Sequence, residues 1–157
     1  MSNWRKRALE LFPDMKTDIE KADSVGMLWV ELESRFHSYY AKLSKGYAQG
    51  SPQLIRAIYA YAIWCSRAKS DDTSNAATIS FYYDVPVNAL NTFRSDPSTY
   101  EQIVKDLVSN LGLAEIKRLR WAFAALIEPH QLEEFMADCG RAARDLQWDL
   151  QKRRRGS

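Results

Sequence analysis

The sequence predicts an all-α protein, a compact single-domain bundle of about seven or eight helices. Along most of the 157-residue chain, apolar residues recur at steps of three and four, which is the spacing of one helical face. The chain has only six glycines and five prolines, and most of them stand where a helix would begin or end. No segment combines alternating polarity with hairpin turns, so we predict no strand. Irregular and helical-repeat-like packing of the bundle both stay open.

The first helices are expected over about residues 3–11, 13–22, 25–43 and 52–65. Ser2 can cap the first of them, and Pro13 fits the first turn of the second. Ser24 can cap the third. A loop follows the third helix, with Gly46 and Gly50 as the expected helix-end and turn residues.

The helix over about residues 52–65 is expected to be central. Ser51 and Pro52 begin it in the preferred order of cap and then proline. Between residues 54 and 65 only Arg56 is charged. A helix that is apolar almost all round is normally covered on several sides, so we place this one in the core.

The next helix, over about residues 74–83, ends in three neighbouring aromatic rings, Phe81, Tyr82 and Tyr83. Successive residues step by about 100° around a helix, so the three rings cannot share one face. We therefore expect them to pack in the core, with one or both tyrosine hydroxyls reaching a partner or water. Asp84 is expected to leave the helix before Pro86, and a short helical segment to follow that proline.

Three further helices are expected over about residues 98–111, 116–127 and 129–150. Ser98 and Glu101 stand three apart as a capping box for the first, which Gly112 ends. Pro129 opens the last, whose apolar residues form a seam toward neighbouring helices. The buried face of the middle helix is predicted to hold Ile116, Leu119, Phe123, Leu126 and Ile127.

The length of 157 residues predicts one domain, over residues 1–150, and the charge pattern predicts a basic, disordered tail over 151–157. The chain has 22 Lys and Arg residues against 20 Asp and Glu residues, which gives a net charge of +2. Four consecutive cations belong to the tail, so the rest of the chain sums to −2. They are Lys152, Arg153, Arg154 and Arg155. Whether Gly156 and Ser157 are native residues stays open.

The cysteines and the hydropathy pattern predict a cytoplasmic protein without membrane contact. Cys65 and Cys139 are far apart and belong to no CxxC pair, so we expect buried free thiols. The opening residues carry charges where a secretion signal would be apolar. The longest nearly apolar stretch is too short to span a bilayer.

The sequence predicts no enzymatic activity, no cofactor and no metal site. The only histidines are His37 and His130. Glu33 lies one helical turn before His37, with Trp29 and Tyr40 on the same side, and this group could orient an imidazole for acid–base catalysis. An exposed ion pair explains the same spacing and is favoured. No nucleophile, phosphate-loop or metal-ligand motif occurs in the sequence.

Nucleic-acid binding is the alternative function. Residues 116–121, with the sequence IKRLRW, and the tail place basic residues near an aromatic one, which suits phosphates and stacked bases. On a helix Lys117 and Arg118 point about 100° apart, so a solvated face explains the pattern as well. The candidate nucleic-acid-binding residues are Lys117, Arg118, Arg120, Lys152, Arg153, Arg154 and Arg155.

The favoured interpretation is a non-enzymatic protein-interaction or regulatory domain, with toxin neutralisation as one such role. The chain has five Trp and eight Tyr residues, more than one small core needs. Trp, Tyr and Arg are enriched where protein interfaces bind most strongly. The partner is expected to be another protein, and the interaction candidates are Trp29, Glu33, His37, Tyr40, Tyr82, Arg120 and Trp121.

Four segments carry a resemblance to a known family, and they read WRKRALELFPDMK, IEKADSVGMLWVEL, LIRAIYAYAIWC and SFYYDVP. Over residues 4–93 the chain resembles a family of small, uncharacterised bacterial helical proteins. The basic tail departs from the family's pattern. The resemblance implies a bacterial, cytoplasmic, single-domain protein, and it assigns no catalytic residue because the family has no established activity.

Overall fold

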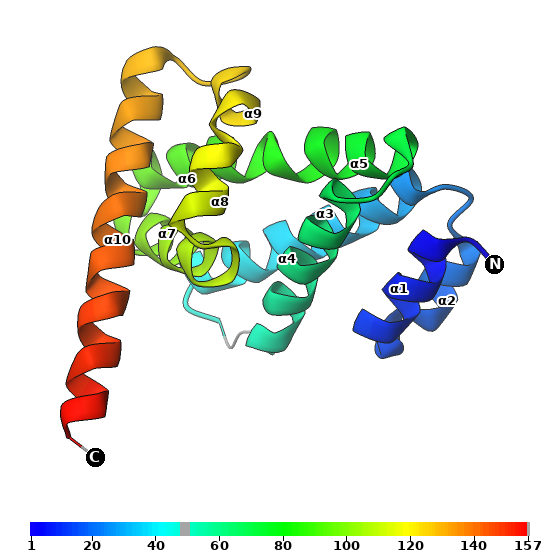
Figure 1. Cartoon of the computed structure of the whole chain (residues 1–157), viewed down its shortest axis with the longest axis horizontal. Coiled ribbons are helices and arrows are strands. Elements are labelled where there is room, and N and C mark those ends of the chain that lie inside the picture. Colours follow the sequence, from blue (N-terminus) through cyan, green and yellow to red (C-terminus); the bar gives the residue numbers. More distant parts are fainter. Residues whose placement is uncertain (48–50, 157) are drawn as a thin grey trace. The chain divides into compact units, whose positions relative to one another are not determined.

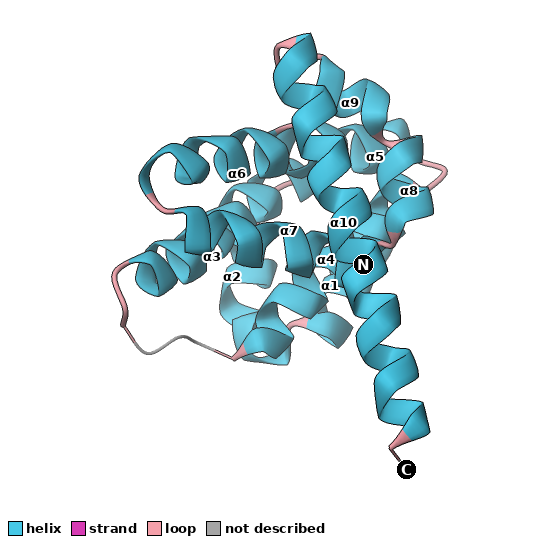
Figure 2. Ribbon diagram, turned by 90° about the vertical axis from the view of Figure 1, so that its left-hand side faces the viewer, coloured by secondary structure: helices cyan, strands magenta, loops and turns pink. Residues whose placement is uncertain are grey.

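The computed structural model describes residues 1–47 and 51–156, and all regular structure in these residues is helical (Figures 1 and 2). The all-α prediction is therefore confirmed. The sequence predicts one domain, whereas the packing gathers the chain into two compact units, Met1–Val85 and Pro86–Ser157. Among the described helices, none is long and apolar enough to cross a membrane. Gly50 and Ser157 lie outside the described residues.

The first unit contains α1 (Asn3–Leu11), a 3₁₀ turn (Pro13–Met15), α2 (Lys16–Lys21), α3 (Val25–Ser44), α4 (Pro52–Ser66) and α5 (Asp71–Ala77). Helix α1 packs against α2 and α4, and α3 packs against α5. The hydroxyl oxygens of Ser24 and Ser51 accept backbone hydrogen bonds at the starts of α3 and α4, as predicted. Ser2 stands at the N-cap of α1, but its side chain makes no capping hydrogen bond. Gly46 follows α3 with a φ of +75°, a conformation that glycine adopts readily.

The core of the first unit is a cluster of aromatic rings around Phe81. The ring centroid of Phe81 lies 5.3 Å from that of Trp29, 5.2 Å from that of Phe36 and 5.4 Å from that of Tyr59. These rings are buried, and α4 supplies one of them, as expected of a central helix. The prediction that the aromatic run packs in the core is therefore confirmed for Phe81 and Tyr82, which are both buried.

The chain does not leave the helix before Pro86, so that prediction is wrong. A π-helical turn, η2 (Thr78–Tyr82), follows α5, and α6 (Asp84–Ser95) begins almost directly after it. Pro86 lies in the first turn of α6, where a backbone N–H has no helical partner to lose.

The second unit contains the greater part of α6 together with α7 (Pro97–Leu111), α8 (Leu113–Arg118), α9 (Arg120–Ala124) and α10 (Pro129–Arg155). Helices α7, α8 and α9 all pack against α10. The single helix expected over 116–127 is divided in two at Leu119 and begins earlier, directly after Gly112. This glycine ends α7 with a φ of +80°. Cys65 in the first unit and Cys139 in the second are buried free thiols, as predicted.

Asp96, and not Ser98, caps α7. Its Oδ1 accepts a hydrogen bond from the backbone N–H of Thr99 at 3.3 Å, and its Oδ2 accepts one from the Thr99 hydroxyl at 2.5 Å. Glu101, the expected second member of a capping box, instead pairs with Lys105 at 3.3 Å. Asp96 precedes a proline that starts the helix, and this arrangement fixes the cap two residues earlier than predicted.

The residues expected to form a disordered tail continue α10 as a helix through Arg155. Gln, Lys and Arg are good helix formers, and cations at the C-terminal end of a helix are favoured by its dipole. The last turns of α10 extend beyond the other helices of the second unit in both ribbon views (Figures 1 and 2).

Candidate functional site

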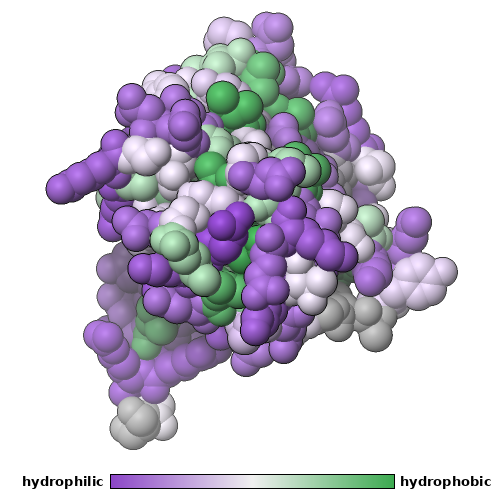
Figure 3. Space-filling model, turned by 90° about the vertical axis from the view of Figure 1, so that its right-hand side faces the viewer, coloured by the Kyte–Doolittle hydropathy of each residue, from purple (hydrophilic) through white to green (hydrophobic). Residues whose placement is uncertain are grey.

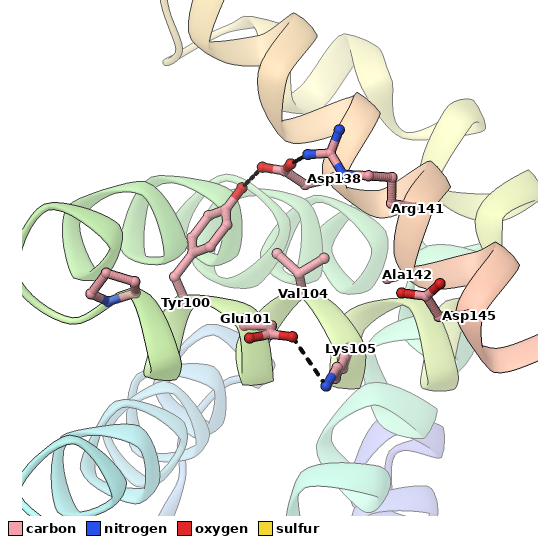
Figure 4. A pocket seen from close by; sticks show the side chains of 9 residues that line it. Tyr100, Glu101, Val104, Lys105, Asp138, Arg141, Ala142 and Asp145 are labelled. Carbon is pink, nitrogen blue, oxygen red and sulfur yellow. Dashed lines mark hydrogen bonds and ion pairs between the residues drawn. The ribbon is translucent and has the colours of Figure 1, made fainter. Parts of the chain in front are cut away.

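A polar pocket of about 300 Å³ lies between α7 and α10 in the second unit (Figure 4). Its floor is formed by buried residues of the two helices, Val104 and Ala142. The ionisable side chains that line it are Tyr100, Glu101, Lys105, Asp138, Arg141 and Asp145. This pocket brings more ionisable groups together than the sequence pattern indicates, because they come from helices far apart in the chain.

Asp138 is the centre of the hydrogen bonding in this pocket. The hydroxyl of Tyr100 donates to one of its carboxylate oxygens, and Nη2 of Arg141 donates to the other (Figure 4). Burial raises the pKa of Tyr100 to about 12, so its hydroxyl keeps its proton at neutral pH. Asp138 is thus engaged by a neutral donor and a cation. The arrangement ties α7 to α10, compensates the Asp138 carboxylate and leaves Tyr100 protonated.

The predicted acid–base group on α3 does not assemble into a pocket. His37 Nε2 lies 4.0 Å from Oε1 of Glu33, and the histidine side chain is 42% exposed. Burial lowers the pKa of His37 below its ordinary value of 6.5, which favours the neutral ring. The pair lies one turn apart on one helix, as the spacing predicts, but Trp29 and Tyr40 are buried and do not join it at the surface.

Three predicted interaction residues are buried, so they are unsuited to contact a partner. Trp29 and Tyr82 pack against Phe81, and Tyr40 packs against Phe36. Large aromatic side chains at helical spacing contribute most when they fill a core, and that role explains all three positions. The prediction that they are interaction candidates is therefore wrong.

The predicted residues Arg120 and Trp121 are exposed at α9. Nη2 of Arg120 donates to the carboxylate of Glu133 on α10, and the Trp121 side chain is 59% exposed. Leu126, which the helical pattern assigns to the buried face, is instead 58% exposed because α9 ends at Ala124 and the helical period stops there. We call this region the α9 surface, and it consists of Arg120, Trp121, Ala124, Ala125 and Leu126.

The segment IKRLRW does not form a free basic stripe. Arg118 is bound to Glu115 through two hydrogen bonds, of 3.0 Å and 2.7 Å. Arg120 is bound to Glu133. Lys117 is exposed, but α8 and α9 are separate helices, so these cations do not follow one another along a single face.

The predicted tail cations are exposed on the last turns of α10, together with an aromatic residue that is absent from the predicted set. Trp148 is 63% exposed and lines a small pocket of about 80 Å³ with Gln151, Lys152 and Arg155. The spacing in the sequence could have indicated this group, because Gln151, Lys152 and Arg155 follow Trp148 by three, four and seven positions and so share its side of the helix.

The described part of the chain holds no group of three or more His, Cys, Asp or Glu residues that could bind a metal ion. His130 is exposed at the start of α10. Comparison with protein-family models, with curated proteins and with solved structures finds no match for the chain.

Proposed function

We propose that this protein is a non-enzymatic protein-interaction domain and that the α9 surface binds its protein partner. The observation that carries the proposal is the exposure of Trp121 and Leu126, 59% and 58%, at one short helix and its end. The viewed face of the molecule is mainly hydrophilic, with hydrophobic side chains in smaller patches (Figure 3). Large apolar side chains that stay exposed within one short segment of such a protein favour an interaction site.

The α9 surface is held in place by buried neighbours, and this supports a preformed binding site. Phe123 points inward from α9, and its ring centroid lies 5.8 Å from that of Phe135 on α10. The Arg120–Glu133 contact holds a guanidinium beside the apolar residues. Trp and Arg are the residues most enriched at the energetic centres of interfaces, and a preformed surface loses less entropy on binding.

The partner in this proposal is another protein of a bacterial cytoplasm. A regulatory subunit needs a stable body and a binding surface but no catalytic group, and the second unit offers both. Neutralisation of a toxin protein is one regulatory role of this kind, and a toxin encoded beside this protein would be the first partner to test.

Site-specific photo-crosslinking in the native host tests the proposal. A photoreactive residue at Ala125 is expected to join the chain to one predominant protein, and Leu126→Asp is expected to abolish that product. The same photoreactive residue at Ile79, an exposed position of the first unit, serves as the control. Identical products from both positions, or a product unaffected by Leu126→Asp, would contradict the proposal.

A further inference from the structure

The last turns of α10 present a tryptophan among cations. The last buried residue of α10 is Ala142, and beyond it Trp148 is 63% exposed. With about 100° between successive residues, Arg144, Lys152 and Arg155 lie within about 40° of Trp148 around the helix axis. We call this region the α10 face, and it consists of Arg144, Trp148, Gln151, Lys152 and Arg155.

The cations of the α10 face are available to a ligand. Within the described residues, no carboxylate lies at ion-pair distance from Arg144, Lys152 or Arg155. Residues 144–155 contain five cations and two carboxylates, Asp145 and Asp149, so their net charge is +5 − 2 = +3. Two of these cations, Lys152 and Arg155, line the small pocket together with Trp148 and Gln151. The face therefore combines positive charge with a flat apolar ring.

We infer that the α10 face binds single-stranded nucleic acid. The backbone phosphates would lie on Arg144, Lys152 and Arg155, and an unpaired base would stack on the Trp148 ring. Proteins that bind single strands use this combination, because cations follow the phosphates while aromatic rings stack on the bases. The amide of Gln151 lies in the same pocket and can hydrogen-bond to the edge of a base.

The other anionic surfaces fit this face less well. A helix that lies on an anionic membrane needs its apolar residues on one side. Trp148 and Leu150 are both exposed, but they point to nearly opposite sides of α10, about 160° apart. An acidic peptide would pair with the cations, but its Asp and Glu side chains offer no aromatic ring to stack on the indole. A nucleic-acid duplex keeps its bases paired and likewise leaves the ring uncovered.

The test is the binding of the full chain to fluorescein-labelled 12-mers of oligo-dT and oligo-rU, measured by anisotropy at low salt. Trp148→Ala is expected to weaken binding by about 5- to 160-fold, the loss of one stacked base. Lys152→Gln with Arg155→Gln is expected to reduce the slope of log K against log salt by about 1.4, because two phosphate contacts are lost. Tyr47→Ala is the control for Trp148→Ala, and the double variant Arg56→Gln with Lys69→Gln is the control for the α10 double variant. All three control positions are exposed residues of the first unit. These controls are expected to bind like the wild type.

Three outcomes would overturn the inference. The first is no binding of either oligonucleotide, and the second is equal weakening by the control pair, which would indicate unspecific charge attraction. The third is Trp148-dependent binding to phosphatidylserine vesicles or to polyglutamate that is tighter than binding to the oligonucleotides. Preference for one oligonucleotide over the other would distinguish RNA from DNA as the ligand. Failure of this test leaves the α9 surface and its protein partner unaffected.

Discussion

The hydroxyl of Tyr100 on α7 donates a hydrogen bond to Asp138 on α10, and the same carboxylate accepts a second hydrogen bond from Arg141. This contact fixes α7 against the middle of the longest helix. It also accounts for the polar pocket of the second unit without assigning chemistry to it. The two candidate binding surfaces lie elsewhere, at α9 and at the end of α10.

Replacing Tyr100 by Phe is expected to lower the free energy of unfolding by about 1–2 kcal/mol. The substitution removes one hydrogen bond to a carboxylate, while Arg141 continues to compensate Asp138. Urea unfolding followed by circular dichroism measures the loss. Tyr47→Phe, at an exposed tyrosine, is the control and is expected to leave the stability unchanged. Equal stability of the two variants would show that the Tyr100 contact contributes nothing.

Replacing Phe81 by Ala is expected to cost about 3–5 kcal/mol, because it empties the centre of the aromatic cluster in the first unit. Ile79→Ala removes an exposed side chain from the same π-helical turn and is expected to cost less than about 0.5 kcal/mol. The two urea midpoints provide the comparison. Similar losses of unfolding free energy in both variants would show that the aromatic cluster around Phe81 does not contribute to the stability of the first unit.

Asp96→Ala is expected to destabilise the protein by about 1 kcal/mol through loss of the α7 cap. Ser98→Ala is expected to have almost no effect, since Ser98 lies inside the helix and is exposed. Thermal unfolding of both variants distinguishes the observed cap from the capping box that the sequence pattern indicates. A larger loss at Ser98 than at Asp96 would contradict the structure.

His37 is expected to make the protein less stable as the pH falls below about 6.5. Burial lowers the pKa of His37 in the folded state, so the unfolded chain binds the proton more tightly and unfolding takes it up. Relative to the wild type, His37→Gln should therefore lose less stability between about pH 7.5 and pH 5.5. An NMR titration of the ring checks the premise directly, and a pKa of 6.5 or above would contradict it.

The helical periodicity of the sequence was sufficient to predict the fold class and most helix positions. The apolar stretch of α4 and the aromatic run around Phe81 are stable in water only when other helices cover them, so their burial could be predicted. The interruption at Leu119 and the end of α9 at Ala124, which leaves Leu126 exposed, could not be predicted, because the same apolar spacing continues across both. The cap at Asp96 was missed because two polar residues compete within the same few positions.

The surfaces were predictable only in part, because periodicity gives the face of a helix and not what covers that face. Trp29 and Tyr40 share a side with His37, but they turn into the core while the histidine stays half-exposed. Arg120 and Trp121, which the sequence indicates as interaction candidates, are exposed. Trp148 belongs to the last turns of α10, which extend beyond the other helices of the second unit (Figure 1). Its exposure therefore depends on the lengths and packing of those helices.

The most direct test of the proposed function is the affinity of the crosslinked protein partner for variants of the α9 surface, measured by isothermal titration calorimetry. Trp121→Ala is expected to raise the dissociation constant by about 30-fold or more, the effect of losing a central interface residue. Tyr47 is similarly exposed in the first unit, and Tyr47→Ala is expected to leave the dissociation constant within about twofold of the wild-type value. If Trp121→Ala and Leu126→Asp both bind the partner with the affinity of the wild type, the α9 surface is not the binding site.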